Sequence, residues 1–304
     1  MSRVFVLGSM NADSFLHVKN FVRPGETIMA SAASSEVGGK GLNQAVASAR
    51  MGVDTVMVGA VGSDQVGANL LESLETEENL DLSRVARIDN ESTGQAMIQL
   101  SESGENAIIV LAGANAANSP EGLESRLEGL TGGDVLVCQL EIPKETVRVG
   151  FALAKAKGAT TILNAAPPTS DQSVLENVDI LIVNETEASS LLSTDEASPS
   201  DSAGEDITTI TTLGEQGAIV HVPGQEPVQV PALQIDLVDS TGAGDAFVGG
   251  LASALARGEE ITRATAFGTA LAASACGAMG AQGYSQRRAD IENMVDNIEN
   301  NASN

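Results

Sequence analysis

Short apolar runs alternate with amphipathic stretches along most of this chain. Val4–Leu7 near the start and Val135–Leu140 in the middle are mostly apolar, as strands buried on both faces are. Lys144–Ala156, in contrast, carries apolar residues at helical spacing, and Gly158 closes the predicted helix. This alternation predicts an α/β fold with a central, mostly parallel sheet flanked by helices.

The same two patterns predict the other elements. Strands are expected at residues 55–61, 161–163, 180–183 and 207–212, and helices at residues 43–51, 65–74, 185–192 and 246–256. The segment SESGEN joins the apolar runs 95–100 and 107–111 as a hairpin loop would, whereas residues 14–28 and 31–37 are less regular. The acidic stretch 193–206 has no packing pattern and is expected to be a solvated loop. Without an internal repeat or a linker, the chain is expected to form a single domain over residues 1–304.

The charge of the chain is strongly one-sided. Its 304 residues include 41 acidic and 16 basic side chains, for a formal net charge of −25. Such a surface repels nucleic acid and anionic membranes, so neither is expected as a partner. The acids are dispersed and aromatic residues make up only 2% of the chain, as in proteins of salt-accumulating microbes. We therefore expect a halophilic protein, with an ordinary acidic enzyme as the alternative.

What the sequence lacks narrows the class of protein further. No run reaches the ~18 apolar residues of a membrane-spanning helix. The first apolar segment is too short for a signal peptide, so a cytoplasmic location is expected. Cys138 and Cys276 lie among small or apolar residues, and we expect both to be buried and unpaired. His17 and His221 have no neighbours at metal-ligand spacing.

A glycine-rich turn precedes the helix expected at residues 43–51. In EVGGKGLNQAVASAR, Gly39 and Lys40 are followed by Gly41 rather than by serine or threonine, so a Walker A phosphate loop is absent. Glycines at a helix start still expose backbone N–H groups, which favour an anion or a polar oxygen. A turn that merely allows close packing explains the same residues, and the pattern leaves both readings open.

A second glycine-rich turn, VDSTGAGDAF, carries a carboxylate. Asp245 falls in the first turn of the helix expected at 246–256, where the helix dipole stabilises a negative charge, and that alone would account for it. Alternatively, the amides of Gly242, Ala243 and Gly244 hold a phosphoryl group while Asp245 takes the proton of an attacking hydroxyl. The second reading predicts phosphoryl transfer.

Several motifs together resemble those of a known family, the ribokinase (PfkB) family of carbohydrate and nucleoside kinases. They occur in the family's order and run nearly end to end: GSMNAD (8–13), PGET (24–27), GGKGLNQAVA (38–47), residues 93–115, QLEIP (139–143), NETEA (184–188), TLGEQG (212–217) and DSTGAGDAF (239–247). The resemblance implies a ribokinase-like fold with a small β lid from about residues 14–37 and 95–111. It also implies a homodimer in which the lids of two subunits pack together.

The resemblance assigns roles to individual residues. Asp245 would be the general base, with Gly242, Ala243 and Gly244 forming the anion hole. Sugar hydroxyls would be held by Asn11, Asp13, Gly39, Lys40, Asn43, Glu141 and Asp245. ATP would be bound by Asn184, Thr212, Gly214, Gly217, Gly244 and Thr269.

Two cation sites follow from the same resemblance. Asn184 and Glu187 match an Asn-x-x-Glu pattern that orders Mg²⁺ through water. A K⁺ site would be formed by Asp239, Thr241, Ala275, Ala278 and Gly280. The sequence departs from the family where GAQGY places Tyr284 at the position of a serine ligand, which puts the K⁺ site in doubt. Leu42 replaces a smaller residue and reshapes the expected sugar pocket.

The implied activity is ATP-dependent phosphorylation of a sugar, D-ribose to D-ribose 5-phosphate, with ATP, Mg²⁺ and K⁺. The nearest alternative is another kinase of the family, acting on a nucleoside, fructose or a 2-keto-3-deoxy sugar acid. A non-catalytic sugar-binding protein is more distant because Asp245 is present. A dinucleotide-dependent oxidoreductase fails because no Gly-x-Gly-x-x-Gly follows the first strand.

Overall fold

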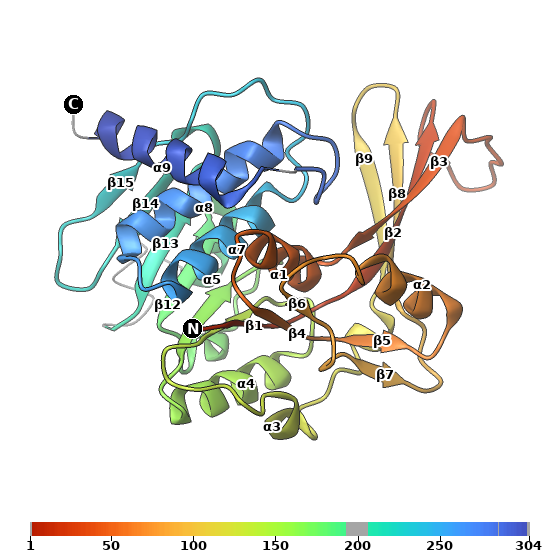
Figure 1. The fold of residues 1–304 in the computed structure, drawn as a ribbon. Coiled ribbons are helices and arrows are strands. Elements are labelled where there is room, and N and C mark those ends of the chain that lie inside the picture. Colours follow the sequence, from red (N-terminus) through yellow and green to blue (C-terminus); the bar gives the residue numbers. More distant parts are fainter. Residues whose placement is uncertain (1, 193–205, 285, 303–304) are drawn as a thin grey trace.

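The computed structural model of the protein describes residues 2–192, 206–284 and 286–302. Within these residues the largest sheet has nine strands, in the order β15-β14-β13-β12-β11-β10-β1-β4-β6 (Figure 1). The pairs from β13 to β6 are parallel, and β14 and β15 add antiparallel pairs at one edge. The predicted α/β fold with a mostly parallel central sheet is confirmed. The strands are β1 (Val4–Leu7), β4 (Thr55–Val58), β6 (Leu80–Asp81), β10 (Val135–Cys138), β11 (Thr160–Asn164), β12 (Ile180–Asn184), β13 (Thr208–Thr212), β14 (Ala218–His221) and β15 (Val228–Val230).

The central strands are buried on both faces because apolar residues fill nearly every position. In β1, Val4 and Val6 belong to one hydrophobic cluster, and Phe5 and Leu7 belong to another. Successive side chains of a strand point to opposite faces, so the two clusters are core layers on either side of the sheet. The first layer includes residues of α1 (Lys40–Arg50), α2 (Gln65–Ser73), α7 (Ala243–Ala256), α8 (Ile261–Cys276) and α9 (Arg288–Ala302). The second includes residues of α3 (Leu123–Arg126), α4 (Lys144–Ala156) and α5 (Glu185–Leu192).

Helices α1, α7 and α8 pack at backbone distance. A Cβ added to Gly249 of α7 would lie 2.4 Å from the Cβ of Ala47 in α1. One added to Gly268 of α8 would lie 2.7 Å from the carbonyl oxygen of Phe247 in α7. Atoms do not approach so closely, so a larger residue at either glycine would force the helices apart. The first turns of α1 and α7, which carry candidate site residues, are thereby held in a fixed relation.

A second, four-stranded sheet projects from the main body at the right of Figure 1. Its order is β3-β2-β8-β9, and we call it the lid sheet; its strands are β2 (Asn11–Val18), β3 (Ala32–Gly38), β8 (Gly94–Ser101) and β9 (Asn106–Leu111). β8 and β9 pair antiparallel, which confirms the predicted hairpin. Apolar side chains remain exposed on it, among them Ile109 (63%) and Val110 (64%). The regions expected at 14–37 and 95–111 thus form one sheet.

Several predicted elements differ from the structure. The strand expected at 55–61 is divided at Gly59, because β5 (Ala60–Gly62) leaves the main sheet to pair with β7 (Ala86–Ile88). Val238, whose apolar side chain before the second glycine-rich turn is typical of a strand, is exposed and lies outside any strand; its N–H donates to the carbonyl of Cys276. Cys138 is buried as expected, but Cys276 is only partly buried. The loop predicted at 193–206 lies, except for its last residue, outside the described residues.

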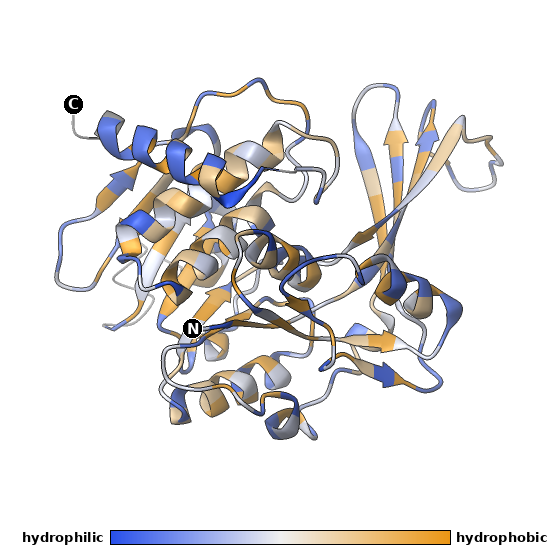
Figure 2. Cartoon of the chain, in the orientation of Figure 1, coloured by the Kyte–Doolittle hydropathy of each residue, from blue (hydrophilic) through white to orange (hydrophobic). Residues whose placement is uncertain are grey.

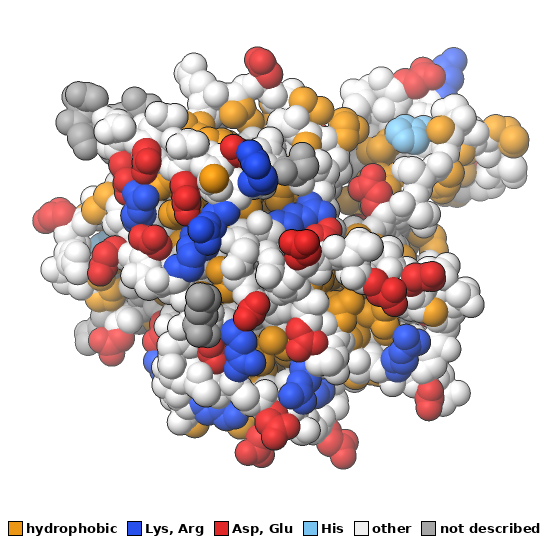
Figure 3. Space-filling view, in the orientation of Figure 1, with side chains coloured by type: hydrophobic (Ala, Val, Ile, Leu, Met, Phe, Trp, Pro, Cys, Tyr) orange, Lys and Arg blue, Asp and Glu red, His pale blue; other side chains and the backbone are white. Residues whose placement is uncertain are grey.

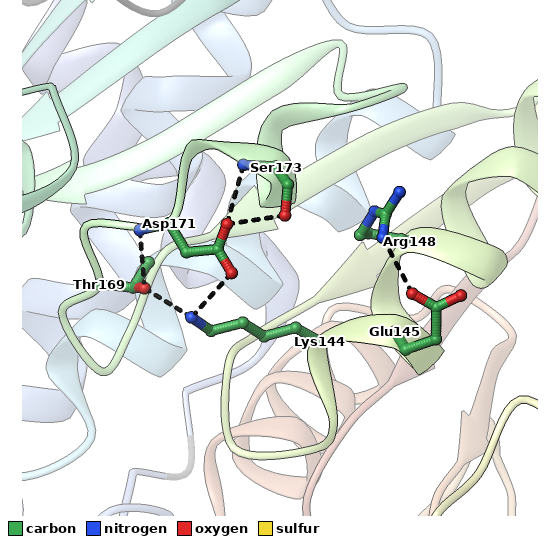
Figure 4. Close-up of polar contacts among 6 residues, drawn as sticks. All are labelled: Lys144, Glu145, Arg148, Thr169, Asp171 and Ser173. Carbon is green, nitrogen blue, oxygen red and sulfur yellow. Dashed lines mark hydrogen bonds and ion pairs between the residues drawn. The ribbon is translucent and has the colours of Figure 1, made fainter.

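Partly buried polar contacts connect the start of α4 to the loop beyond β11 (Figure 4). Lys144 Nζ donates to Thr169 Oγ1 at 2.8 Å and to Asp171 Oδ2 at 3.2 Å, and Ser173 donates to the other oxygen of Asp171. Solvated pairs of this kind contribute little to stability.

On the face drawn in Figure 3, acidic and basic side chains are interspersed. Figure 2 shows α9 as largely hydrophilic, and no helix in the described ranges is long and apolar enough to cross a membrane.

Candidate active site

The candidate residues gather at one edge of the main sheet, beyond the carboxyl ends of its parallel strands. Ser9 follows β1, Glu141 follows β10, Asn164 ends β11, and Asn184 ends β12. Parallel strands present these ends at the same edge, which is where ligands bind in open α/β sheets. The topology therefore brings together motifs that are far apart in the sequence.

The glycine-rich turn before α1 faces Glu141. Gly39 has a φ of 90°, and a Cβ added to it would lie 2.9 Å from the backbone nitrogen of Asn11, so only glycine fits there. Glu141 Oε2 accepts hydrogen bonds from the N–H of Lys40 at 3.1 Å and from the hydroxyl of Ser9 at 2.6 Å. The predicted sugar-binding residues Gly39, Lys40 and Glu141 therefore lie together.

Asp245 lies in the first turn of α7 and is 7% exposed. Its Oδ2 accepts a hydrogen bond from Asn43 Nδ2 at 3.0 Å, and its Oδ1 accepts one from Gln44 Nε2 at 2.9 Å. Gly242 supplies the left-handed residue that begins the helix, with a φ of 75°. A Cβ added to Gly244 would meet no atom within 4 Å, so the space at the turn is open. A buried carboxylate thus stands beside an open helix N-terminus.

Burial strengthens the Asp245 carboxylate as a base. Burial raises the pKa of the Asp245 carboxyl, and the Lys40 ammonium and two amide donors limit the rise. Burial alone would lower the pKa of Lys40, but the carboxylates of Asp245, Glu141 and Glu187 raise it. A carboxylate with a raised pKa takes a proton more readily than a solvated one, provided that it is ionised.

Two predicted sugar-binding residues lie on the first half of β2. Asn11 Oδ1 accepts a hydrogen bond from Asn115 Nδ2 at 2.8 Å. Within the described part of the chain, the buried Oδ1 of Asp13 has no hydrogen-bond partner. Burial raises the pKa of Asp13, and nearby acids, of which Glu141 has the largest effect, raise it further to about 6. A buried acceptor without a donor is costly, so Asp13 is suited to receive a hydroxyl from a ligand.

A cavity of about 830 Å³ reaches the turn at Ala243 and Gly244. Ligand pockets usually enclose roughly 300–1,000 Å³, so a nucleotide fits by size. Its walls include five residues predicted to bind ATP, namely Thr212, Gly214, Gly217, Gly244 and Thr269. Apolar side chains that suit a flat aromatic ring complete them: Leu233, Ile235, Leu237 and Phe247. Phosphates of a nucleotide held here would lie toward the turn that precedes Asp245.

Asn184 and Glu187 form a reciprocal cap at the start of α5. The N–H of Asn184 donates to Glu187 Oε2 at 2.9 Å, and the N–H of Glu187 donates to Asn184 Oδ1 at 2.8 Å. This capping box accounts for the Asn-x-x-Glu spacing on local grounds. Neither residue lines the cavity. Burial raises the pKa of Glu187, and the Lys40 ammonium and the Asp245 carboxylate also act on it, so it lies at the edge of the site.

The two segments predicted to hold K⁺ lie against each other. The N–H of Asp239 donates to the carbonyl of Cys276 at 3.2 Å. Asp239 in turn accepts hydrogen bonds from the N–H of Gly280 at 3.0 Å and from that of Thr241 at 2.9 Å. Burial would raise the pKa of Asp239, but these backbone donors lower it. Each carboxylate oxygen of Asp239 thus accepts a backbone N–H group, and the bond from Gly280 joins the two segments.

Tyr284 belongs to the hydrophobic core. It is 3% exposed, and the guanidinium of Arg50 lies 5.3 Å from the centre of its ring. Arg50 also donates to the carbonyl of Tyr284 at 3.1 Å. At the end of α8, the carbonyl of Ala275 accepts the N–H of Ala278 at 3.0 Å. The departure from the expected serine therefore leaves the contacts of Asp239 in place.

Sequence reasoning missed four parts of this region. Gln44 contacts Asp245 directly, and its role was not predicted. Its position next to Asn43 in the quoted motif could have suggested that role. Gln282 Nε2 donates to Asn43 Oδ1 at 2.8 Å across a large sequence separation that no local pattern records. The segment 232–237, most of which lines the cavity, has no regular periodicity. Cys276 lines the same cavity.

Comparison with known proteins assigns the chain to a family. Residues 1–287 match the family described as pfkB family carbohydrate kinase. The chain belongs to this family. The carbohydrate kinase is 36% identical over 269 residues to a ribokinase of Staphylococcus aureus (strain COL), covering 85% of this chain and 88% of the relative. A solved structure of Arabidopsis thaliana ribokinase complexed with ribose and ATP is 28% identical, with a TM-score of 0.89 over 97% of this chain and 99% of that one.

Proposed function

We propose that this pfkB-family carbohydrate kinase transfers the γ-phosphoryl group of ATP to D-ribose, giving D-ribose 5-phosphate. The observation that carries the proposal is the position of Asp245. This buried carboxylate directly follows Gly244, which lines a nucleotide-sized cavity, and it accepts hydrogen bonds from Asn43 and Gln44 of α1, the helix that begins at Lys40. The ribokinases among its relatives, one of them complexed with ribose and ATP, support ribose as the acceptor.

In the proposed reaction Asp245 is the general base. It takes the proton of the sugar hydroxyl as the hydroxyl oxygen attacks the γ-phosphorus, and the bond from that phosphorus to the β–γ bridging oxygen breaks to release ADP. The N–H groups of Gly242, Ala243 and Gly244, at the positive end of α7, stabilise the charge on the transferred group.

The other predicted residues bind and orient the substrates. Asp13 Oδ1 accepts one sugar hydroxyl, because it is buried and lacks a protein donor among the described residues. Asn11, Gly39, Lys40, Asn43 and Glu141 hold the remaining hydroxyls. ATP occupies the cavity lined by Thr212, Gly214, Gly217, Gly244 and Thr269, with Asn184 near its phosphates.

Two cations complete the proposal. Asn184 and Glu187 would hold Mg²⁺ through water, and the ion would neutralise phosphate charge when bound. Asp239 and Thr241, with the backbone of Ala275, Ala278 and Gly280, would hold K⁺. The contacts of Asp239 with Thr241 and Gly280 tie this segment to the anion-hole turn.

A panel of acceptors, scored by ADP release at high KCl, tests the proposal. Ribose should give the highest kcat/KM, with fructose, adenosine and 2-keto-3-deoxygluconate well below it. Asp245→Asn is the control for ATP hydrolysis unrelated to transfer. A nucleoside or a sugar acid preferred over ribose would overturn the assignment, and ribose binding without ADP release would favour the non-catalytic alternative.

We also infer that two copies associate through their lid sheets in the cytoplasm of a salt-adapted cell. The exposed apolar residues of β9, with Ile108 and Val110 on one face and Ile109 on the other, supply apolar surface that a second lid sheet would cover. Sedimentation at high KCl should give a dimer for the parent chain and a monomer for Val110→Glu. A parent chain that sediments as a monomer would contradict this inference.

A further inference from the structure

Each oxygen of the Asp245 carboxylate is held by a different neutral amide. Gln44 Nε2 lies 2.9 Å from Oδ1, and Asn43 Nδ2 lies 3.0 Å from Oδ2. Both donors are adjacent residues of α1, and α1 is packed against α7 without space between their backbones. The orientation of the carboxylate is therefore set by α1 rather than by α7, on which it stands.

Both amides are themselves oriented by a second pair of amides. Gln282 Nε2 donates to Asn43 Oδ1 at 2.8 Å, and Gln139 Nε2 donates to Gln44 Oε1 at 2.6 Å. Gln44 Nε2 also donates to Asn164 Oδ1 at 3.1 Å. If Asn43 or Gln44 were inverted, a carbonyl oxygen would face the carboxylate, and two acceptors would be in contact. Gln139 and Gln282 thus determine that Gln44 and Asn43 turn their N–H groups, and not their carbonyl oxygens, toward the carboxylate.

Burial makes this arrangement rigid. Gln44 and Gln139 are fully buried, and Asn43 is 7% exposed. A Cβ added to Gly8 would lie 2.0 Å from Gln139 Oε1, so the outer amide fits only because residue 8 is glycine. In buried surroundings, a missing or misdirected donor is more costly than it is at the surface.

We propose that Gln44 and Gln282 are positioning residues for the proton transfer at Asp245, Gln44 by direct contact and Gln282 through Asn43. The proposal rests on the proposed function, in which Asp245 is the general base. Neither glutamine is assigned a contact with the sugar or with the transferred phosphoryl group. Together they hold the carboxylate in one rotational position and direct a donor to each of its oxygens, so that it meets the sugar hydroxyl without reorganising.

Five ionisable groups outside α7 interact electrostatically with Asp245, so that the charge of one affects the pKa of the other. They are Asp13, Lys40, Glu141, Glu187 and Tyr284. All of them are unchanged when a glutamine is replaced. A difference between the pH profiles of parent and variant therefore reports the amide that was removed.

The test replaces each glutamine with methionine, which has a similar length but no N–H group. Gln44→Met should lower kcat by about 10- to 100-fold and Gln282→Met by about 3- to 10-fold, with a smaller change in the KM for ATP. The acidic limb of the kcat profile should move to higher pH in both, because amide donors favour the ionised carboxylate. Gln65→Met is the matched control, since Gln65 is exposed and its side chain donates to the exposed side chain of Asn69 on α2.

The outcomes separate this inference from the proposed function. If Asp245→Asn retains turnover, the base assignment and the inference both fail. If Asp245→Asn loses turnover while Gln44→Met and Gln282→Met keep the parent's kcat, only the inference fails. A uniform loss at every pH with an unmoved acidic limb also overturns it, because that is the mark of a purely structural residue. Should Gln44→Met not fold by circular dichroism, the half-buried Gln282 decides the matter.

Discussion

Asp245 is a buried carboxylate whose two oxygens both accept amide donors. Asp245→Asn should keep the fold and much of the sugar affinity, yet lose kcat by ~10²-fold or more, because the proton of the hydroxyl has no acceptor. Calorimetry with ribose and a coupled kcat assay measure the two effects separately. Glu185→Gln, which removes an exposed acid from the first turn of α5, is the control. Near-normal turnover in Asp245→Asn would show that Asp245 is not the base and that its charge serves only to interact with the dipole of α7.

Asp13 is a destabilising residue in the absence of ligand. Its folded-state pKa of about 6 lies above the ordinary value of 3.8, so its ionised form is the one that folding disfavours. This cost is absent below the ordinary pKa and is reached in full above pH 6. Asp13→Asn should therefore raise the free energy of unfolding by up to about 3 kcal/mol at pH 7.5 and by less than half as much at pH 4.5.

Urea unfolding at the two pH values measures the effect of Asp13→Asn, with the exposed Asp54→Asn as control. The same variant should raise the KM for ribose, since an amide replaces the unpartnered carboxylate oxygen. A variant that is no more stable at pH 7.5, or that binds ribose unchanged, would remove Asp13 from the sugar site.

At the scale of elements, the sequence was most informative where one local cause dominates. Apolar periodicity predicted both ends of α4 and the start of α5 to the residue, and the motif glycines placed the turns at Gly39 and Gly242. The division at Gly59 was not predictable, because it depends on where β5 finds a partner in β7.

The site shows the same division between local and distant causes. Five predicted nucleotide residues line one cavity. The contact between Gln282 and Asn43 escaped prediction because it joins segments that only the finished fold brings together. The ring of Tyr284 turned inward because Arg50 stacks on it, which no pattern within GAQGY indicates.

The loop after α8 and the segment at Asp239 together make a K⁺ effect testable. A cation held there would fix the turn's amides toward the phosphate, so K⁺ should raise kcat more than it changes KM. Rates are compared at constant ionic strength with K⁺, Na⁺ and tetramethylammonium, at saturating ATP and ribose. Asp239→Asn should abolish the preference for K⁺. Equal parent rates in all three salts would show that salt acts only on the acidic surface.

The whole molecule carries a formal net charge of −25. Its acids repel one another over ~30 Å at 0.01 M ionic strength but over only ~3 Å at 1 M. We expect the melting temperature to rise steeply with KCl and the chain to loosen on dilution of salt. Differential scanning fluorimetry across a KCl series measures this, with tetramethylammonium chloride separating screening from any specific K⁺ effect. A melting temperature that ignores salt would contradict the halophilic interpretation.

Strand β2 connects the proposed sugar site with the lid sheet. Asn11 and Asp13, near its start, belong to the proposed sugar site, and its hydrogen-bonded ladders to β3 and β8 continue along the rest of the lid sheet. A sugar that immobilises Asn11 and Asp13 must therefore damp the motion of the whole strand. Amide hydrogen exchange should slow along the lid at positions that no ligand atom reaches. The lid sheet should therefore respond to sugar binding. The signal of a fluorophore attached to β9 should change when sugar binds, before any phosphate is transferred.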